Sequence, residues 1–237
     1  MGAGGGVTRS TLRQQIADAL RDEVLAGRMR PRVEFTVKQI AEQYGVSATP
    51  VREALFDLSA QGLLESDQHR GFRVREFTVA DYRSMVEARA LVIDGVFRGI
   101  FDGTGSAPAV PAAHLPALVS VRRRAEEATR AALSGDLDIL IGYDLRFWRE
   151  LGAVIGNTYI NDFLQRLRMQ AWIFAVPYLR GDADVRDWLW NGHRELVEAI
   201  TAADGPAVRA VLDAYHAHGT DWADRLAADN PPHPGHG

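Results

Sequence analysis

Basic and hydroxyl side chains gather around one short segment of the chain in a pattern that could bind DNA. Ser47, Thr49 and Arg52 lie close together, and Lys38 precedes them. Hydroxyl groups and arginine can hydrogen-bond to bases and phosphates, and lysine neutralises phosphate charge. We therefore expect a DNA-binding surface made by Lys38, Ser47, Ala48, Thr49, Arg52, Arg70 and Gly71.

A helix-turn-helix is the element that would present these side chains. Thr36 and Gln39 have the spacing of a capping box that opens a short helix, and Gly45 is suited to end it. Ser47 or Thr49 can cap a second helix directly afterwards. The apolar residues of this second helix repeat at helical spacing: Val51, Leu55 and Leu58. This is the layout of a recognition helix, whose first residues enter the major groove.

The flanking residues extend the motif to a winged form. Upstream, apolar residues recur every four positions and predict an amphipathic helix from residue 9 to about residue 27: Leu12, Ile16, Leu20 and Val24. Downstream, residues 63–65 and 72–75 can pair as two strands around a turn at 67–71. That hairpin is the expected wing.

The charge distribution is compatible with a DNA-binding first part. The net charge of the chain is −4, but residues 1–77 hold 11 basic and 10 acidic residues, whereas residues 78–237 hold 16 and 21. The basic residues around the motif could track phosphates on both sides of a groove: Arg28, Arg30, Arg32, Lys38, Arg70, Arg73 and Arg75. For any one of them, a solvated surface charge is an equal explanation.

Length and composition favour two modest domains with a short junction near residue 77. The chain has 237 residues, 46% of them hydrophobic, and no cysteine. It has no run of 18 apolar residues and no apolar signal-peptide core at its start, so we expect a cytoplasmic protein with no membrane partner. The fold is expected to be mainly α: a winged helix-turn-helix at residues 9–77, then an all-α helical bundle at 78–229, with disordered tails at 1–8 and 230–237. Its helices should span about 79–101, 114–134, 136–155, 157–179, 183–203 and 205–229, with a loop at 103–113.

In combination, several motifs resemble one known family. The first part carries GVSATPVREAL, then GLLES and RGFRV, and the second part carries DLRFW from Asp144 and HRELVEAI from His193. This pattern resembles the GntR superfamily of bacterial transcription regulators, in the branch whose C-terminal half is the FCD domain. The resemblance covers residues 8 to 229. It implies a DNA-binding homodimer, taken here as a repressor although the residues do not distinguish repression from activation.

The resemblance also implies a metal site that this sequence has partly lost. Members with a metal use an Asp and a His four residues apart and two further histidines. The matching positions here are Asp144, Trp148, His193 and Tyr215, so two of the four ligands are replaced. An indole N–H cannot coordinate a metal and a neutral phenol is a poor ligand, so no metal cofactor is expected. A one-residue shift that places His216 at the site remains an alternative.

The altered site favours an organic effector. Trp148 and Tyr215 would fill the volume of a metal and its waters, and beside Asp144, His193 and Arg89 they suit a partly apolar ligand with an acidic group. Arg89 matches an arginine that in the family often meets an effector carboxylate, for which a guanidinium has bidentate geometry. The alternative is that the two aromatic side chains simply plug an unused cavity.

Three functions follow from these patterns. The first is a ligand-responsive regulator that binds a palindromic operator as a homodimer, with effector binding in the bundle controlling DNA affinity. The second is a DNA-binding dimer without an effector, whose bundle is only a dimerisation scaffold. The third is an enzyme using Asp144 and His193, against which stands the absence of a nucleophile elbow, a phosphate loop or a full metal set. We therefore expect a protein that is not an enzyme.

Ala48 is expected to alter the operator sequence. Many members of the family that the chain resembles have arginine at this position, and an arginine bidentate to guanine contributes roughly 1–3 kcal/mol of discrimination. An alanine side chain cannot make these bonds, but its methyl group can contact a thymine methyl. The operator should therefore differ from the commonest family sequence at the corresponding base pair.

Overall fold

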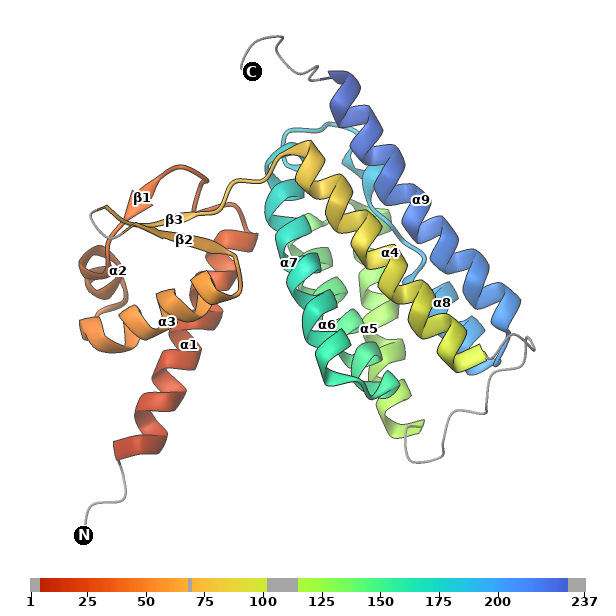
Figure 1. Cartoon of the computed structure of the whole chain (residues 1–237), viewed down its shortest axis with the longest axis horizontal. Coiled ribbons are helices and arrows are strands. Elements are labelled where there is room, and N and C mark those ends of the chain that lie inside the picture. The colour runs from red at the N-terminus through yellow and green to blue at the C-terminus, as the bar shows by residue number, and fades with distance from the viewer. Residues whose placement is uncertain (1–4, 68–69, 102–114, 230–237) are drawn as a thin grey trace. The chain divides into compact units, whose positions relative to one another are not determined.

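The computed structural model describes residues 5–67, 70–101 and 115–229 (Figure 1). The chain divides into two compact units, residues 1–77 with 172–177 and residues 78–171 with 178–237. The expected loop at 103–113, part of the wing tip and the C-terminal tail lie outside the described residues. No helix in the described part is long and apolar enough to cross a membrane.

The first unit is a winged helix-turn-helix, as predicted. Its elements are α1 (Gly5–Leu25), β1 (Glu34–Phe35), α2 (Val37–Tyr44), α3 (Ala48–Ala60), β2 (Leu64–Asp67) and β3 (Gly71–Val74). The expected start of the first helix at residue 9 was wrong, because α1 begins at Gly5 and therefore takes in residues 5–8, which were assigned to a disordered tail. A helix can extend through residues without an apolar stripe once its later turns are packed.

The helix-turn-helix forms through the capping groups found in the sequence. The Thr36 hydroxyl accepts a hydrogen bond from the Gln39 backbone N–H at 3.2 Å, and the Gln39 side chain accepts one from the Thr36 N–H at 2.8 Å. Gly45 ends α2 in the left-handed conformation, with φ of 65°. This reciprocal cap and the left-handed residue fix the short turn between α2 and α3.

The apolar stripes of α1 and α3 form the core of the first unit. Val51, Leu55 and Leu58 on α3 are fully buried, and Ile16, Leu20 and Val24 on α1 are buried as well. These are the residues whose spacing predicted the two helices, so the periodicity also predicted which face is internal. The opposite face of α3, with Thr49 and Arg52, is exposed.

The wing contains a strand that the sequence did not reveal. The sheet has three strands in the order β1-β3-β2, and both pairings are antiparallel. β1 pairs Phe35 with Phe72 of β3. A two-residue strand carries no alternation from which it could be recognised.

Gly71 brings the wing against β1 and should not tolerate a side chain. Its φ is +103°, and a Cβ atom at this position would lie 2.5 Å from the Phe35 carbonyl oxygen. We expect Gly71→Ala to lower the free energy of unfolding by about 1–3 kcal/mol through backbone strain, with the clash adding to it. Urea unfolding would measure the change. Gly45→Ala is the matched control, because Gly45 also has positive φ but open space around it. Equal losses for the two variants would show that the contact with Phe35 is unimportant.

The second unit is an all-α bundle. Its helices are α4 (Val79–Phe101), α5 (Leu115–Ser134), α6 (Leu137–Ile155), α7 (Thr158–Leu179), α8 (His193–Thr201) and α9 (Gly205–Asp229), with a short 3-10 helix, η2 (Val185–Trp188), before α8. Residues 172–177 of α7 are grouped with the first unit. Five of the six expected helices are confirmed to within a residue or so at their ends. Within the described part of this unit there is no strand, as expected.

The expected continuous helix over residues 183–203 was wrong. The chain forms η2, then an extended residue, Leu189, and α8 starts only at His193. The break is held from another helix: the Thr129 hydroxyl on α5 donates to the Asn191 carbonyl oxygen at 3.0 Å and accepts from the Arg194 N–H at 3.2 Å. A partner more than 60 residues away determines where α8 begins, so local propensity could not reveal it.

The helices of the second unit pack in pairs around a hydrophobic core. α4 packs along α9, α5 packs on α6 and α8, and α8 packs on α9 (Figure 1). One core cluster draws on α5, α6, α8 and α9: Val121, Ala125, Phe147, Trp148, Leu151, Leu196, Val197, Ala199, Val208, Val211 and Tyr215. Trp148 and Tyr215, both expected at the effector site, are therefore part of the core.

Candidate functional site

The residues predicted to contact DNA lie on α2, at the start of α3 and on the wing of the first unit. Six of them are exposed on α2, on α3 or its cap, and on the wing: Lys38, Ser47, Ala48, Thr49, Arg52 and Arg70. Lys38, Ala48 and Arg52 line a groove together with Gly71 and Phe72 of the wing. The groove therefore brings together side chains from the three elements that a winged helix-turn-helix uses.

The start of α3 leaves its polar groups available to a ligand. Ser47, and not Thr49, is the N-cap residue of α3, and its side chain makes no capping hydrogen bond. Thr49 lies exposed in the first turn. Both hydroxyl groups can therefore bond to an external partner, and the N-terminus of a helix favours a negatively charged one such as phosphate.

Arg52 differs from Arg70 and Arg73 of the wing in having no carboxylate partner among the described residues. Arg70 lies 3.7 Å from Glu34, and Arg73 lies 2.7 Å from Glu65. Exposed ion pairs of this kind contribute about 0–1 kcal/mol, so a phosphate could replace either carboxylate at little cost. The Arg52 guanidinium needs no such exchange before it contacts DNA.

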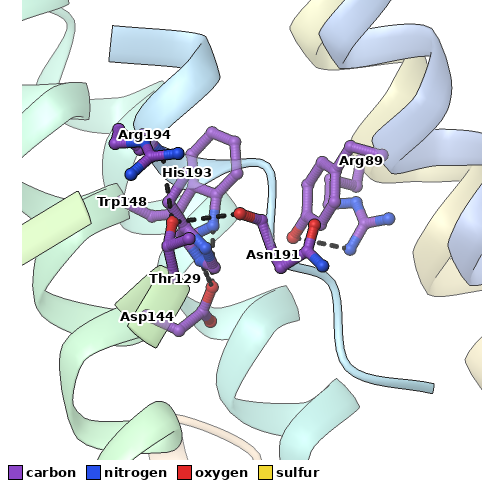
Figure 2. A network of polar contacts seen from close by, with 8 residues as sticks. Arg89, Thr129, Asp144, Trp148, Asn191, His193 and Arg194 are labelled. Carbon is purple, nitrogen blue, oxygen red and sulfur yellow. Dashed lines mark hydrogen bonds and ion pairs between the residues drawn. The ribbon is translucent and has the colours of Figure 1, made fainter. Parts of the chain in front are cut away.

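In the second unit, the residues predicted for the effector site lie together and are buried. His193 is 1% exposed, and its Nε2 atom lies 2.9 Å from Asp144 Oδ1. The Trp148 indole N–H donates to the same Asp144 oxygen at 3.0 Å. Figure 2 shows this carboxylate joining the two rings, and on the other side Arg89, whose Nη1 donates to the Tyr215 hydroxyl at 2.9 Å. The cluster joins α4, α6, α8 and α9.

Aromatic rings close this cluster. The Trp148 ring stacks on Tyr215, with centroids 4.9 Å apart and an angle of 21°, and on Trp190 at 5.8 Å and 25°. The His193 ring lies against Trp190 at 4.4 Å and against Phe147 at 5.1 Å. The rings fill the space among the polar groups. In this conformation the structure therefore favours the alternative that Trp148 and Tyr215 plug an unused cavity.

Thr129 is a positioning residue that the sequence did not indicate. Its hydroxyl holds the backbone on both sides of His193, as Figure 2 shows, and so fixes where α8 begins. His193 is the first residue of α8 and reaches Asp144 from that position. A threonine inside a long helix belongs to no motif, so no signal in the sequence separated it from its neighbours.

Arg168 on α7 is a second residue that the sequence did not indicate. It is 3% exposed, and its Cζ atom lies 4.2 Å from the centroid of the Trp148 ring. Burial lowers the pKa of the Arg168 guanidinium, and Tyr215 and Asp144 offset part of that effect. A charged group this deep in the bundle requires compensation by partners.

The donor set does not fit a divalent metal. Asp144 and His193 are hydrogen-bonded to each other. The Trp148 indole N–H donates to the same Asp144 oxygen, and an indole N–H cannot act as a third metal ligand. The described residues contain no group of three or more His, Asp or Glu side chains close enough to hold an ion. His216, the alternative third ligand, instead lines a groove between α4 and α9.

This groove reaches two residues of the buried cluster. It has a volume of about 370 Å³, and its walls include Leu91 on α4 and Leu212 and His216 on α9. Arg89 and Tyr215 also line it. The groove is therefore the surface feature that leads to the polar cluster.

A winged helix-turn-helix joined to an all-helical domain is the arrangement expected of a DNA-binding transcription regulator. The family model described as bacterial regulatory proteins of the gntR family matches residues 6–74, and the FCD domain model matches residues 98–218. The chain belongs to the GntR family, with an FCD domain as its second part.

Relatives agree with this assignment. The chain is 33% identical over 216 residues to the transcriptional regulator McbR of Escherichia coli, covering 88% of this chain and 90% of that protein. It is 29% identical over 198 residues to a probable D-xylose utilization operon transcriptional repressor of Paenarthrobacter nicotinovorans, covering 84% and 82%. The solved structure of E. coli McbR/YncC has the same fold, with a TM-score of 0.70, 19% identity and 91% and 98% coverage. A putative GntR regulator from Rhodococcus has a TM-score of 0.67, 21% identity and 91% and 97% coverage.

Proposed function

We propose that this GntR-family protein is a cytoplasmic homodimer that binds a palindromic operator and represses transcription until a small organic acid binds its FCD domain. The observation that carries the DNA-binding part is the groove shared by Lys38, Ala48, Arg52 and Gly71. The winged helix-turn-helix of one protomer contacts one half-site through its recognition helix. A dimer therefore requires two half-sites related by symmetry. The relative named as a repressor supports repression as the mode of control.

The effector part of the proposal rests on the buried cluster of the second unit. Arg89, Asp144, Trp148, His193 and Tyr215 are assigned to effector binding. A dimerisation scaffold has no need of buried arginines, which are costly to desolvate. An effector that binds one conformation of the bundle more tightly would shift the population between DNA-binding and non-binding states.

A second candidate function is a regulator without an effector. The stacking of Trp148 on Tyr215 within the core favours it, because the rings leave the polar cluster closed. An enzyme is not proposed: Asp144 and His193 are buried and bonded to each other, and the relatives are transcription regulators.

Selection of binding sites from random DNA tests the operator. We expect the full-length chain to recover a palindrome, held at about 10⁻⁸ M or tighter at physiological salt. Because Ala48 cannot form two hydrogen bonds to guanine, the base pair facing it should favour thymine contacts over a strict guanine. Ala48→Arg should shift the selected base toward guanine. Recovery of a strict guanine by the wild-type chain would contradict the role of Ala48, and recovery of no palindrome would contradict the dimeric operator.

A further inference from the structure

Two buried guanidinium groups in the second unit have donors that no protein group satisfies. Arg89 Nη2 and Arg168 Nε are both buried, and neither has a hydrogen-bond partner in the protein. Arg89 is 7% exposed and Arg168 is 3% exposed. An unsatisfied buried donor on a charged group costs more than a neutral one, so two in one cluster indicate that a further acceptor belongs there.

The charges of the cluster indicate that this acceptor is negatively charged. Arg89 and Arg168 both carry a guanidinium, and Asp144 is the one buried carboxylate among the described residues. One of its oxygens already accepts from Trp148 and His193. The cluster therefore has two guanidinium charges against one carboxylate, and an anion would balance it.

Tyr215 indicates the shape of the ligand. Its ring lies parallel to Trp148 within 21°, and its hydroxyl oxygen accepts from Arg89 Nη1 at 2.9 Å. A flat ring stacked on an indole, with an oxygen directed at a guanidinium, is thus what the cluster accommodates. A carboxylate on such a ring has more lone pairs than a phenol and could also satisfy Arg89 Nη2 and Arg168 Nε.

We propose that the FCD domain binds an aromatic monocarboxylate in place of the Tyr215 ring, stacked on Trp148 and held by Arg89 and Arg168. This deepens the effector part of the proposed function and rests on it. A site built on Arg89 alone would hold the carboxylate with one guanidinium, whereas this proposal requires Arg168 as the second.

In this proposal the acid enters through the groove between α4 and α9, whose lining also includes the carboxylates of Glu87, Asp94 and Asp213. Tyr215 and Arg89 line it and also belong to the buried cluster, so Tyr215 separates the groove from Trp148. A volume of about 370 Å³ is enough for a small aromatic acid. The ligand enters the groove, and the Tyr215 side chain rotates out of its stacked position to admit it.

Thermal unfolding of the full chain with benzoate as probe tests the proposal. Benzoate should raise the melting temperature of the wild-type chain by roughly 5–10 °C at a hundredfold excess over its Kd. Benzamide, which has the same shape without the charge, and cyclohexanecarboxylate, which has the charge without a flat ring, should raise it far less. No shift with benzoate, 4-hydroxybenzoate or phenylacetate, or an equal shift with benzamide, would overturn the proposal.

Variants of Arg168 separate ligand binding from a structural role. Arg168→Met keeps the length of the side chain without its charge, and we expect it to raise the Kd for benzoate at least tenfold in protein that still unfolds cooperatively. Loss of the attraction between Arg168 and Asp144 can also lower the ligand-free melting temperature, so the Kd is the deciding measurement. Arg168→Lys should keep part of the affinity. Arg209→Met is the matched control: Arg209 also lies over an aromatic ring, that of Phe97, but is paired with Asp94 and Asp213. A wild-type Kd in Arg168→Met would remove Arg168 from the site.

Tyr215→Ala tests the displacement. Removing the ring removes the competitor for Arg89 and Trp148, so the variant should bind benzoate more tightly than the wild-type chain. Weaker binding would contradict the exchange of ring for ligand.

Failure of the proposed function is recognised separately: benzoate would bind with these variant effects yet leave the affinity for the operator unchanged. Conversely, a non-aromatic acid could bind through Arg89, show the same Kd in Arg168→Met as in the wild-type chain, and release the protein from DNA. That result would support the proposed function and overturn this inference.

Discussion

Arg52→Ala is expected to weaken binding of the selected operator by about 10- to 100-fold. Arg52 is exposed on α3 within the groove shared with Lys38, Ala48 and Gly71, and no carboxylate in the described part of the chain pairs with it. A good bidentate contact to a base contributes roughly 1–3 kcal/mol, or about 5- to 160-fold in Kd, and the expected loss lies within these limits. Fluorescence anisotropy at fixed salt measures the Kd.

Two comparisons show whether Arg52 reads bases or only phosphates. If it reads bases, Arg52→Ala should lose much less affinity for random DNA than for the operator, whereas Lys38→Ala should lose affinity for both and reduce the salt dependence by about one ion. Arg13→Gln on α1, which does not line the groove, should stay within about twofold of the wild-type Kd. Operator binding by Arg52→Ala within threefold of the wild-type value would remove Arg52 from the interface.

Asp144→Ala is expected to destabilise the second unit by about 2–5 kcal/mol. Its Oδ1 atom accepts both the Trp148 indole N–H and the His193 Nε2 bond, and all three side chains are buried. Removal of the carboxylate leaves these groups without a partner where water does not reach them. Urea or thermal unfolding would show the loss, the latter as a fall of roughly 10 °C.

Asp138→Ala is the matched control on the same helix. Asp138 forms an exposed ion pair with Arg180, so its removal should cost about 0–1 kcal/mol. A loss for Asp144→Ala no greater than that of the control would mean that the buried cluster does not hold the bundle together. In that case, the closed arrangement of Trp148 and Tyr215 would have another cause.

The helix-turn-helix was predictable because its determinants are local. The Thr36 and Gln39 cap, the left-handed Gly45 and the buried stripe of α3 each involve residues within a few positions of one another. The same holds for α6 in the second unit, where Asp136 caps the helix and Gly156 ends it. Because the spacing of the apolar residues predicted the buried face of α3, it also predicted which side chains of α3 are exposed.

The predicted effector residues were brought together, but the arrangement of their bonds was not predictable. The sequence placed Asp144, Trp148, His193 and Tyr215 in one region through the family pattern, and the structure shows which atoms bond. Arg168 was missed because one arginine among many on a helix gives no signal until its neighbours in space are known. Its burial and its stacking on Trp148 arise from helices distant in the chain.

By itself, the sequence determined that the first unit is a helix-turn-helix and which of its helices is the recognition helix, because both depend on residue type and short spacing. Only the tertiary structure decided that β1 completes the wing and that Thr129 sets the start of α8. It also decided that two arginines face one carboxylate in the core. Those features depend on contacts between residues far apart in the chain, and the free energy of such contacts overrides local propensity without leaving a local pattern.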